Sequence, residues 1–294
     1  MHPYSACDRP AYLEPLADTA RCFPEVFRPR ADDSHKGTHG TLALIGGAEG
    51  MSGALVLAAT AAMYNGSGKV WAGFRQASLP MPIIPGRPEI MLSTAVELLE
   101  RDGINTWVCG CGLGLDDEAA ATLLHQLQIL GREPLLLDAD ALSWLARQPQ
   151  HRDNWVLTPH PGEAARLLGC SVAEVEADRL ASVRALQRRY GGVVVLKGAG
   201  SLICDGQQLW LCTEGNPGMA SGGMGDLLSG IIAALYAQGL PLATACCVGV
   251  CIHGEAADLA ACAGERGLLA SDLLPLIRRL VNPQDTMNHV SIPD

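Results

Sequence analysis

This sequence has few basic residues and no basic cluster, which excludes several classes of function. Lysine and arginine together number 21 against 31 aspartates and glutamates, so the formal net charge is −10. Without a long basic stripe the chain is not expected to bind nucleic acid or an anionic membrane surface. Its longest apolar runs, such as Ala54 to Met63, are too short to cross a bilayer. No basic segment followed by an apolar one opens the chain, so we expect no signal peptide.

The cysteines lack the paired spacing that zinc sites use. Eleven are scattered along the chain. Cys109 and Cys111 lie at the end of an expected strand, and Cys246, Cys247 and Cys251 share a helical stretch, but neither group is joined by a second pair of ligands. We therefore expect no metal held by thiols. In a chain without a secretion signal, scattered cysteines indicate reduced thiols and a cytoplasmic location.

Two widespread nucleotide-binding motifs are also missing. The segment Ile45-Gly-Gly-Ala-Glu-Gly-Met-Ser-Gly53 only loosely resembles a dinucleotide fingerprint. Because residues 50–88 contain no Asp or Glu to hold a ribose, we do not expect a classical NAD-binding Rossmann site. Gly68-Lys69 is followed by Val70 instead of Ser or Thr, so it is not a P-loop.

Short apolar runs alternate with amphipathic stretches through the middle of the chain. The runs typical of strands are residues 41–45, 70–73, 107–109, 135–137, 155–157 and 193–196. The stretches typical of helices are residues 53–65, 117–130, 141–147, 163–168 and 172–190, the last opened by a capping box of Ser171 and Glu174. This alternation predicts a doubly wound α/β fold, with a largely parallel central sheet and helices on both faces.

The ends of the chain follow different patterns. Residues 1–34 are rich in Pro, Arg and Asp, and are expected to form an irregular arm with at most a short helix. After residue 197 we expect a hairpin of residues 202–204 and 209–212 about Asp205-Gly206, and then helices. Since no repeat or long linker divides the rest, residues 35–294 are expected to form one domain.

The most informative segment is the glycine-dense loop 216–226, which leads into an apolar helix expected over residues 227–238. Glycines let the backbone approach a ligand, and free N–H groups at a helix start attract anions such as phosphate. The expected anion hole is Gly222, Gly223, Met224 and Gly225. At its mouth, Asp226 suits a general base beside a transferring phosphoryl group, although an Asp in a first turn equally suits a helix cap. The helix dipole predicts a low pKa for Asp226.

Three further clusters follow expected strands, where ligands bind in sheets of this kind. Residues 110–114, Gly-Cys-Gly-Leu-Gly, suit either backbone contact with a flat ligand or a simple tight turn. His160 lies between two prolines that stiffen it, so its ring is expected to face the cleft. Lys197 ends a buried strand, where its cation suits nucleotide phosphates or merely extends to solvent.

Together these motifs resemble those of the ADP-dependent NAD(P)H-hydrate dehydratases, a ribokinase-like family. In order they are His35-Lys-Gly-Thr-His-Gly40, Ile45-Gly-Gly, Met51-Ser-Gly-Ala54, Cys109-Gly-Cys-Gly-Leu-Gly114, Leu157-Thr-Pro-His-Pro-Gly-Glu163, Leu196-Lys-Gly-Ala-Gly-Ser201 and the loop 216–226. Each motif is weak alone, but their order is specific and extends from His35 to the C-terminal helices. The sequence departs from the usual family pattern at Cys111 and Met224, which removes no charge or donor from the expected chemistry.

The resemblance implies a reaction and a role for each matching residue. ADP would phosphorylate the hydroxyl of the (6S) hydrate of NADH or NADPH, and loss of phosphate would regenerate the dihydronicotinamide and leave AMP. Asp226 is the implied catalytic residue. Ala54, Gly114, His160 and Asp226 match positions that contact the hydrate, and Lys197, Gly198, Ala199, Gly200, Ser201 and Gly225 match positions that contact the nucleotide. Mg²⁺ is expected to bridge the nucleotide phosphates, with no direct protein ligand.

The resemblance also implies a homotetramer and a separate functional partner. The chain has no room for a second catalytic domain ahead of His35, so we expect a stand-alone dehydratase that works beside an NAD(P)H-hydrate epimerase. Two alternatives stay open. A ribokinase-like kinase that phosphorylates a hydroxymethyl-pyrimidine or hydroxyethyl-thiazole with ATP would use the same anion hole and base. A nucleotide-sensing regulator would keep the glycines but need no Asp226.

Overall fold

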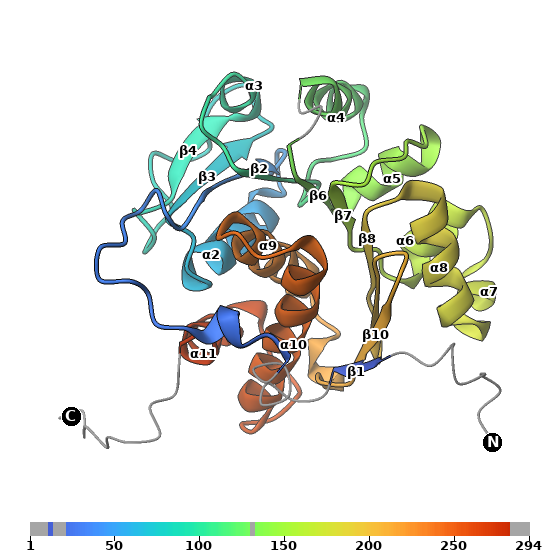
Figure 1. The fold of residues 1–294 in the computed structure, drawn as a ribbon. Coiled ribbons are helices and arrows are strands. Elements are labelled where there is room, and N and C mark those ends of the chain that lie inside the picture. The colour runs from blue at the N-terminus through green and yellow to red at the C-terminus, as the bar shows by residue number, and fades with distance from the viewer. Residues whose placement is uncertain (1–10, 14–21, 130–132, 283–294) are drawn as a thin grey trace, which may run out of the picture.

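A ten-stranded sheet forms the centre of the computed structural model, which describes residues 11–13, 22–129 and 133–282 (Figure 1). The strands are β1 (Ala11–Leu13), β2 (Thr41–Gly46), β3 (Lys69–Phe74), β4 (Met91–Thr94), β5 (Thr106–Cys109), β6 (Leu135–Leu137), β7 (Trp155–Leu157), β8 (Val193–Leu196), β9 (Ser201–Cys204) and β10 (Leu209–Cys212). Their order is β1-β10-β9-β8-β7-β6-β5-β2-β3-β4. From β8 to β4 in this order the strands run parallel, whereas β9 is antiparallel to both of its neighbours.

Helices cover both faces of the sheet, as Figure 1 shows. One face packs against α2 (Ser52–Tyr64), α9 (Met224–Ala237), α10 (Leu242–Ala261) and α11 (Leu274–Leu280). The other face carries α3 (Ala95–Leu99), α4 (Asp117–Ile129), α5 (Asp140–Arg147), α6 (Pro161–Leu168), α7 (Val172–Ala177) and α8 (Arg179–Tyr190). Short 3₁₀ turns occupy Pro24–Phe27, Pro217–Met219 and Ala270–Leu273.

The core therefore has two halves, one on each side of the sheet. Every residue of β2 is buried, because alternate side chains point to opposite faces and both faces are covered. Leu42 and Leu44 pack with α2 and α9, whereas Ala43 and Ile45 pack with α3 and α5 on the other side. The predicted α/β fold, with a largely parallel sheet between two helical layers, is confirmed.

The predicted elements are present with small shifts at their ends. The six predicted strands correspond to β2, β3, β5, β6, β7 and β8, and the predicted hairpin is β9 and β10. The predicted end of the fourth helix at residue 130 lies outside the described residues. Besides β1, neither β4 nor α3 was predicted. In β4 only Ser93 is buried, so the strand lacks the continuous apolar run that marks the others.

Two local predictions are wrong. The arm was expected to hold at most a short helix, but Ala11–Leu13 is a strand that pairs parallel with β10 at the edge of the sheet. The single helix expected over residues 172–190 is instead α7 and α8, separated at Asp178. The Asp178 backbone is not helical, with φ −147° and ψ 81°, and its side chain accepts a hydrogen bond from the Ala181 N–H at 2.9 Å, so it caps the start of α8.

One helix is longer and more apolar than the sequence analysis allowed. Helix α10, Leu242–Ala261, has the length and composition of a membrane span. However, 67% of its most apolar 18 residues is buried inside the protein, where it packs against α9, α11 and the strands β7 to β10. This burial is typical of a core helix, since the apolar surface is already covered by protein.

The close crossing of α2 and α9 depends on Gly230. A Cβ atom at Gly230 would lie 2.1 Å from the Ala58 carbonyl oxygen, so the two helices cannot keep their separation around a side chain. We expect Gly230→Ala to lower the free energy of unfolding by about 1–3 kcal/mol, as overpacking does. Gly53→Ala in α2 is the matched control, because its Cβ would meet open space and alanine favours a helix. Denaturant unfolding measures both, and equal stability of the two variants would contradict this packing.

Candidate active site

A cavity of about 780 Å³ lies at the carboxyl ends of β6, β7 and β8, beside the start of α9. Its lining consists of Asp138, Ala139, His160, Glu163, residues 197–201, 213–217, 219–221 and 224–226, Leu228, Val250, His253 and Gly254. The cavity therefore occupies the edge at which ligands bind in parallel sheets. It brings together residues from Asp138 to Gly254, which lie far apart in the sequence.

The start of α9 offers three free backbone N–H groups to this cavity. The first helical hydrogen bond is donated by Leu227 to the Gly223 carbonyl at 3.0 Å, so the N–H groups of Met224, Gly225 and Asp226 precede it. All three residues line the cavity, whereas Gly222 and Gly223 do not. The helix begins three residues earlier than expected, which moves the free N–H groups from the glycine pair into the first turn. They form an anion-binding site with the positive end of the helix dipole.

A largely buried ion pair lies beside this helix start. Lys197 Nζ is 2.7 Å from Asp138 Oδ1, and the other Asp138 oxygen accepts a hydrogen bond from Ser229 Oγ at 2.8 Å. Burial alone would lower the pKa of Lys197, but Asp138 and Glu163 together raise it, so the lysine is charged. A Cβ at Gly225 would lie 3.1 Å from Lys197 Nζ, which shows how closely the helix start approaches the pair.

Asp226 differs from its expected electrostatic state. Burial and then the neighbouring Asp138 carboxylate raise the pKa of Asp226, whereas Cys111 and Lys197 lower it, and the resulting pKa is about 6. The predicted low pKa is therefore wrong, because desolvation outweighs the helix dipole at this position. A carboxylate with this pKa is a better proton acceptor near neutral pH than an ordinary aspartate. Its place in the cavity lining favours a chemical role over a cap alone.

His160 and Glu163 form a second titrating pair on the cavity wall. His160 precedes α6, and its backbone N–H donates a hydrogen bond to Glu163 Oε2 at 2.7 Å. The backbone N–H of Gly162 donates to the ring nitrogen His160 Nδ1 at 3.0 Å. Burial, and then the charge of Lys197, lowers the pKa of His160, so the ring is neutral near pH 7 and carries its proton on Nε2. Burial raises the pKa of Glu163 to about 7 despite Lys197, whose Nζ lies 3.9 Å from Glu163 Oε2.

Three residues of the site were not proposed from the sequence. Asp138 is 1% exposed, and its signal was an acid directly after the apolar run of β6. Glu163 stood within a quoted motif but was given no role. His253 was given no role from the sequence, yet it lines the cavity and its Nε2 is buried without a hydrogen-bond partner in the described structure. Burial lowers the pKa of His253 to about 4, so it is neutral and available to a polar ligand.

Two proposed substrate contacts lie outside the lining of this cavity. The Gly114 N–H donates to Asp140 Oδ2 at 2.8 Å, and Trp144 Nε1 donates to the Gly114 carbonyl at 3.2 Å. Ala54, in α2, lies against Gly112, where an added Cβ would be 3.3 Å from the Ala54 Cβ. Gly114 therefore lies in the turn after β5 and Ala54 packs against this turn, which adjoins the site through Cys111 and its effect on the Asp226 pKa. By contrast, His160, residues 197–201, Met224, Gly225 and Asp226 share the cavity.

This arrangement suits phosphoryl transfer. Free amides at a helix start and the Lys197 ammonium stabilise negative charge on phosphate oxygens, and the carboxylate of Asp226 lies among them to accept a proton. The hairpin, the loop after it and α10 also contribute residues to the cavity lining. These residues offer a bound nucleotide further contacts.

Comparison with known proteins agrees with this chemistry. A family model described as NAD(P)H-hydrate dehydratase matches residues 42–279. The chain belongs to this family. It is 51% identical to the ADP-dependent (S)-NAD(P)H-hydrate dehydratase of Neisseria meningitidis, over 91% of this chain and 93% of that protein.

The chain is also similar to a longer bifunctional enzyme and to a dehydratase of known structure. The chain is 48% identical to the bifunctional NAD(P)H-hydrate repair enzyme Nnr of Escherichia coli over 90% of its own length, and it spans 52% of that protein. A crystal structure of the ADP/ATP-dependent NAD(P)H-hydrate dehydratase from Bacillus subtilis, co-crystallized with ATP/Mg²⁺, superposes with a TM-score of 0.78 at 30% identity. The superposition covers 86% of this chain and 92% of the Bacillus subtilis chain.

The electrostatic coupling at the cavity wall can be measured on His160. We expect its pKa, followed by NMR, to lie below the ordinary 6.5 and to rise in Lys197→Met, because that variant removes a neighbouring positive charge and leaves Asp138 unpaired. Lys69→Met is the control, since Lys69 lies at the amino-terminal end of β3. A His160 pKa that falls or stays constant in Lys197→Met would contradict this coupling.

Proposed function

We propose that this protein dehydrates the (6S) hydrate of NADH or NADPH at the expense of ADP, giving NADH or NADPH, AMP and phosphate. The observation that carries the proposal is the position of Asp226, which faces the cavity from the first turn of α9 with a pKa of about 6. A carboxylate among anion-binding amides has a use when a hydroxyl must lose its proton as it accepts a phosphoryl group. The family to which the chain belongs supports the same reaction.

In the first step the hydroxyl oxygen on C6 of the hydrate attacks the β-phosphorus of ADP. The bond between that phosphorus and the bridging oxygen breaks, and AMP leaves. The hydroxyl proton passes to Asp226 Oδ as the new bond forms. The free N–H groups of Met224, Gly225 and Asp226, together with Lys197, hold the negative charge on the transferring oxygens. Because such a transition state is loose, a base with a pKa of about 6 is sufficient.

In the second step phosphate leaves from C6. The ring nitrogen's lone pair pushes the C–O bond to break, and loss of a proton from C5 then restores the dihydronicotinamide double bond. Phosphorylation matters because phosphate is a far better leaving group than hydroxide. Neutral His160 and partly protonated Glu163 are the titratable groups that line the same wall and can take up or return protons as phosphate departs.

The cavity fits Mg²⁺ held mainly by the nucleotide. Both oxygens of Asp138 are engaged, one by Lys197 and one by Ser229, so this carboxylate cannot also serve as a full metal ligand. Asp226, in the first turn of α9 beside the free amides, is placed to face a phosphate-bound ion. When bound, Mg²⁺ would neutralise charge on the phosphates. We further propose a cytoplasmic homotetramer that works beside an epimerase, a partner suggested by the bifunctional relatives.

The reaction itself is the first experiment. Purified protein with NADH hydrate, Mg²⁺ and ADP should restore the near-ultraviolet absorbance of dihydronicotinamide and release AMP and phosphate in equal amounts. The S hydrate should be consumed quickly and the R hydrate only at its spontaneous epimerisation rate. Phosphorylation of hydroxymethyl-pyrimidine or hydroxyethyl-thiazole by ATP is the control reaction. Product from that control without recovery of absorbance would replace this proposal with the vitamin-kinase alternative.

The role of Asp226 has a distinct kinetic signature. We expect kcat/KM of the wild type to fall with decreasing pH below about 6, since the carboxylate then binds a proton and can accept no other. Asp226→Asn should lower turnover by at least about a hundredfold while ADP binding, measured by calorimetry, persists. Asp153→Asn, an exposed acid ahead of β7, is the matched control. Near-normal turnover of Asp226→Asn would leave Asp226 as a helix cap and refute the mechanism.

A further inference from the structure

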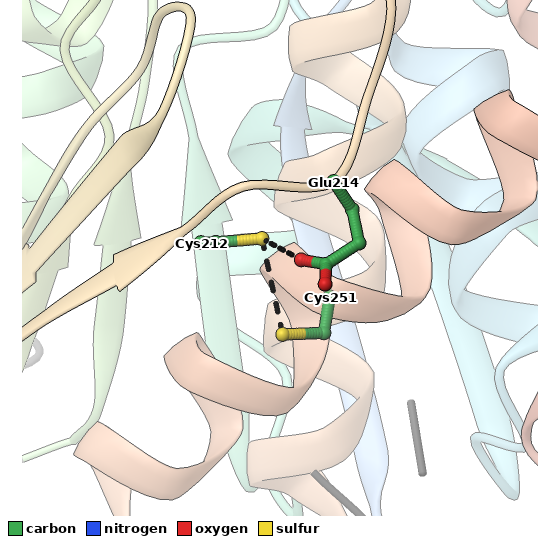
Figure 2. Close-up of side chains that lie close together, drawn as sticks. All are labelled: Cys212, Glu214 and Cys251. Carbon is green, nitrogen blue, oxygen red and sulfur yellow. Dashed lines mark hydrogen bonds between the residues drawn. The ribbon is translucent and has the colours of Figure 1, made fainter. Parts of the chain in front are cut away.

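A compact group of two thiols and a carboxylate lies beside the cavity, outside the residues that the mechanism uses. Figure 2 shows Cys212 at the end of β10, Glu214 in the following loop and Cys251 on α10, with their side chains pointing toward one another. Cys251 Sγ is 3.8 Å from Cys212 Sγ, and Cys212 Sγ is 2.7 Å from Glu214 Oε2. One ligand atom from each residue lies within 4.8 Å of the others.

Contacts between the loop and α10 hold the three side chains of this group together. Gly254 follows Cys251 by one helical turn, and a Cβ there would lie 2.6 Å from the Glu214 Cβ, so the glycine lets the loop approach α10. Asp258, one further turn along, accepts hydrogen bonds from the Gly215 N–H at 3.0 Å and from Asn216 Nδ2 at 2.9 Å. The loop is therefore fixed to α10 at Glu214 and at the two residues that follow it.

We propose that Cys212, Cys251 and Glu214 bind a thiophilic divalent cation of the zinc or cadmium class. Zinc bonds of about 2.3 Å to sulfur at a tetrahedral angle place two sulfurs about 3.8 Å apart, the separation of these two thiols. Zinc bonds of about 2.0 Å to oxygen require the sulfur and oxygen ligands to lie about 3.5 Å apart. Since Glu214 Oε2 is now 2.7 Å from Cys212 Sγ, the carboxylate must move away by less than about 1 Å. The fourth position would be taken by water from the cavity that Glu214 lines.

The protons and charges of the group are consistent with replacement of the two thiol protons by a divalent cation. The thiol of Cys251 donates to Cys212, and the thiol of Cys212 donates to Glu214. The remaining Glu214 oxygen, Oε1, is buried without a hydrogen-bond partner in the described part of the chain. When the cation binds, both thiol protons leave to solvent and the two thiolates and the carboxylate compensate its double charge, with one negative charge in excess.

This site was not visible from cysteine spacing. Cys251 had been grouped with Cys246 and Cys247 on the same helix, but its sulfur lies beside Cys212, 39 residues away. The inference does not rest on the proposed function, since binding of a cation can be measured without any substrate. Because Glu214 lines the same cavity as the loop residues that follow it, occupancy is expected to alter nucleotide binding there.

Titration of the reduced, full-length protein with Cd²⁺ tests the proposal. Thiolate–cadmium absorbance in the ultraviolet should indicate one tight site in the wild type, released on addition of Zn²⁺ or a chelator, with about two protons liberated per ion. Cys212→Ser/Cys251→Ser should remove this site, and Glu214→Gln should weaken it by at least about tenfold. Cys246→Ser/Cys247→Ser is the matched control, because these buried thiols of α10 lie outside the group.

Each outcome decides the question. A site that persists in Cys212→Ser/Cys251→Ser, or one whose affinity is unchanged in Glu214→Gln, would overturn the proposal. Formation of a Cys212–Cys251 disulfide with diamide, together with no tight Cd²⁺ site in the reduced protein, would also overturn it and make the pair a redox element. If the double serine variant does not fold, the proton count and Glu214→Gln on the wild-type background still decide.

Discussion

The Lys197–Asp138 ion pair is the interaction on which the rest of the site depends. It joins the residue after β8 to the residue after β6, across the intervening strand β7, at a distance of 2.7 Å. Such a pair is stable only when its remaining hydrogen-bonding capacity is used, and Ser229 on α9 satisfies the second Asp138 oxygen. The pair thus ties two strand ends to the helix that presents Asp226. Removing either partner would leave a charge buried without compensation.

The same pair sets the protonation of its neighbours. Asp138 adds to the effect of burial in raising the pKa of Asp226 to about 6, and Lys197 adds to the effect of burial in lowering the pKa of His160. The pKa of Glu163, raised to about 7 by burial, leaves this carboxyl group partly protonated near neutral pH. A site that must receive the phosphates of a nucleotide benefits from this, because fully ionised carboxylates would repel them.

Glycine at a few positions allows these groups to approach one another. Gly225 brings the start of α9 against Lys197, Gly230 brings α9 against α2, and Gly254 brings the Glu214 loop against α10. Each contact places a backbone or a charged group where a Cβ would be. The active-site cavity and the proposed cation site therefore both depend on the loop after β10, which is fixed to α10. The strand ends form the opposite wall of the cavity.

The sequence by itself determined the layered α/β architecture and the principal motif positions, since continuous apolar runs predict strands covered on both faces and glycines before an apolar helix predict an anion site. Only the tertiary structure decided which side chains share the cavity and how they ionise. Asp138 and His253 carry no local signal that distinguishes them from a cap and a packing residue. The pKa of Asp226 could not be predicted correctly either, because the helix dipole acts locally whereas desolvation depends on every segment that covers the carboxylate. The meeting of Cys212 with Cys251 likewise follows from the packing of a hairpin on α10, which no spacing along the chain encodes.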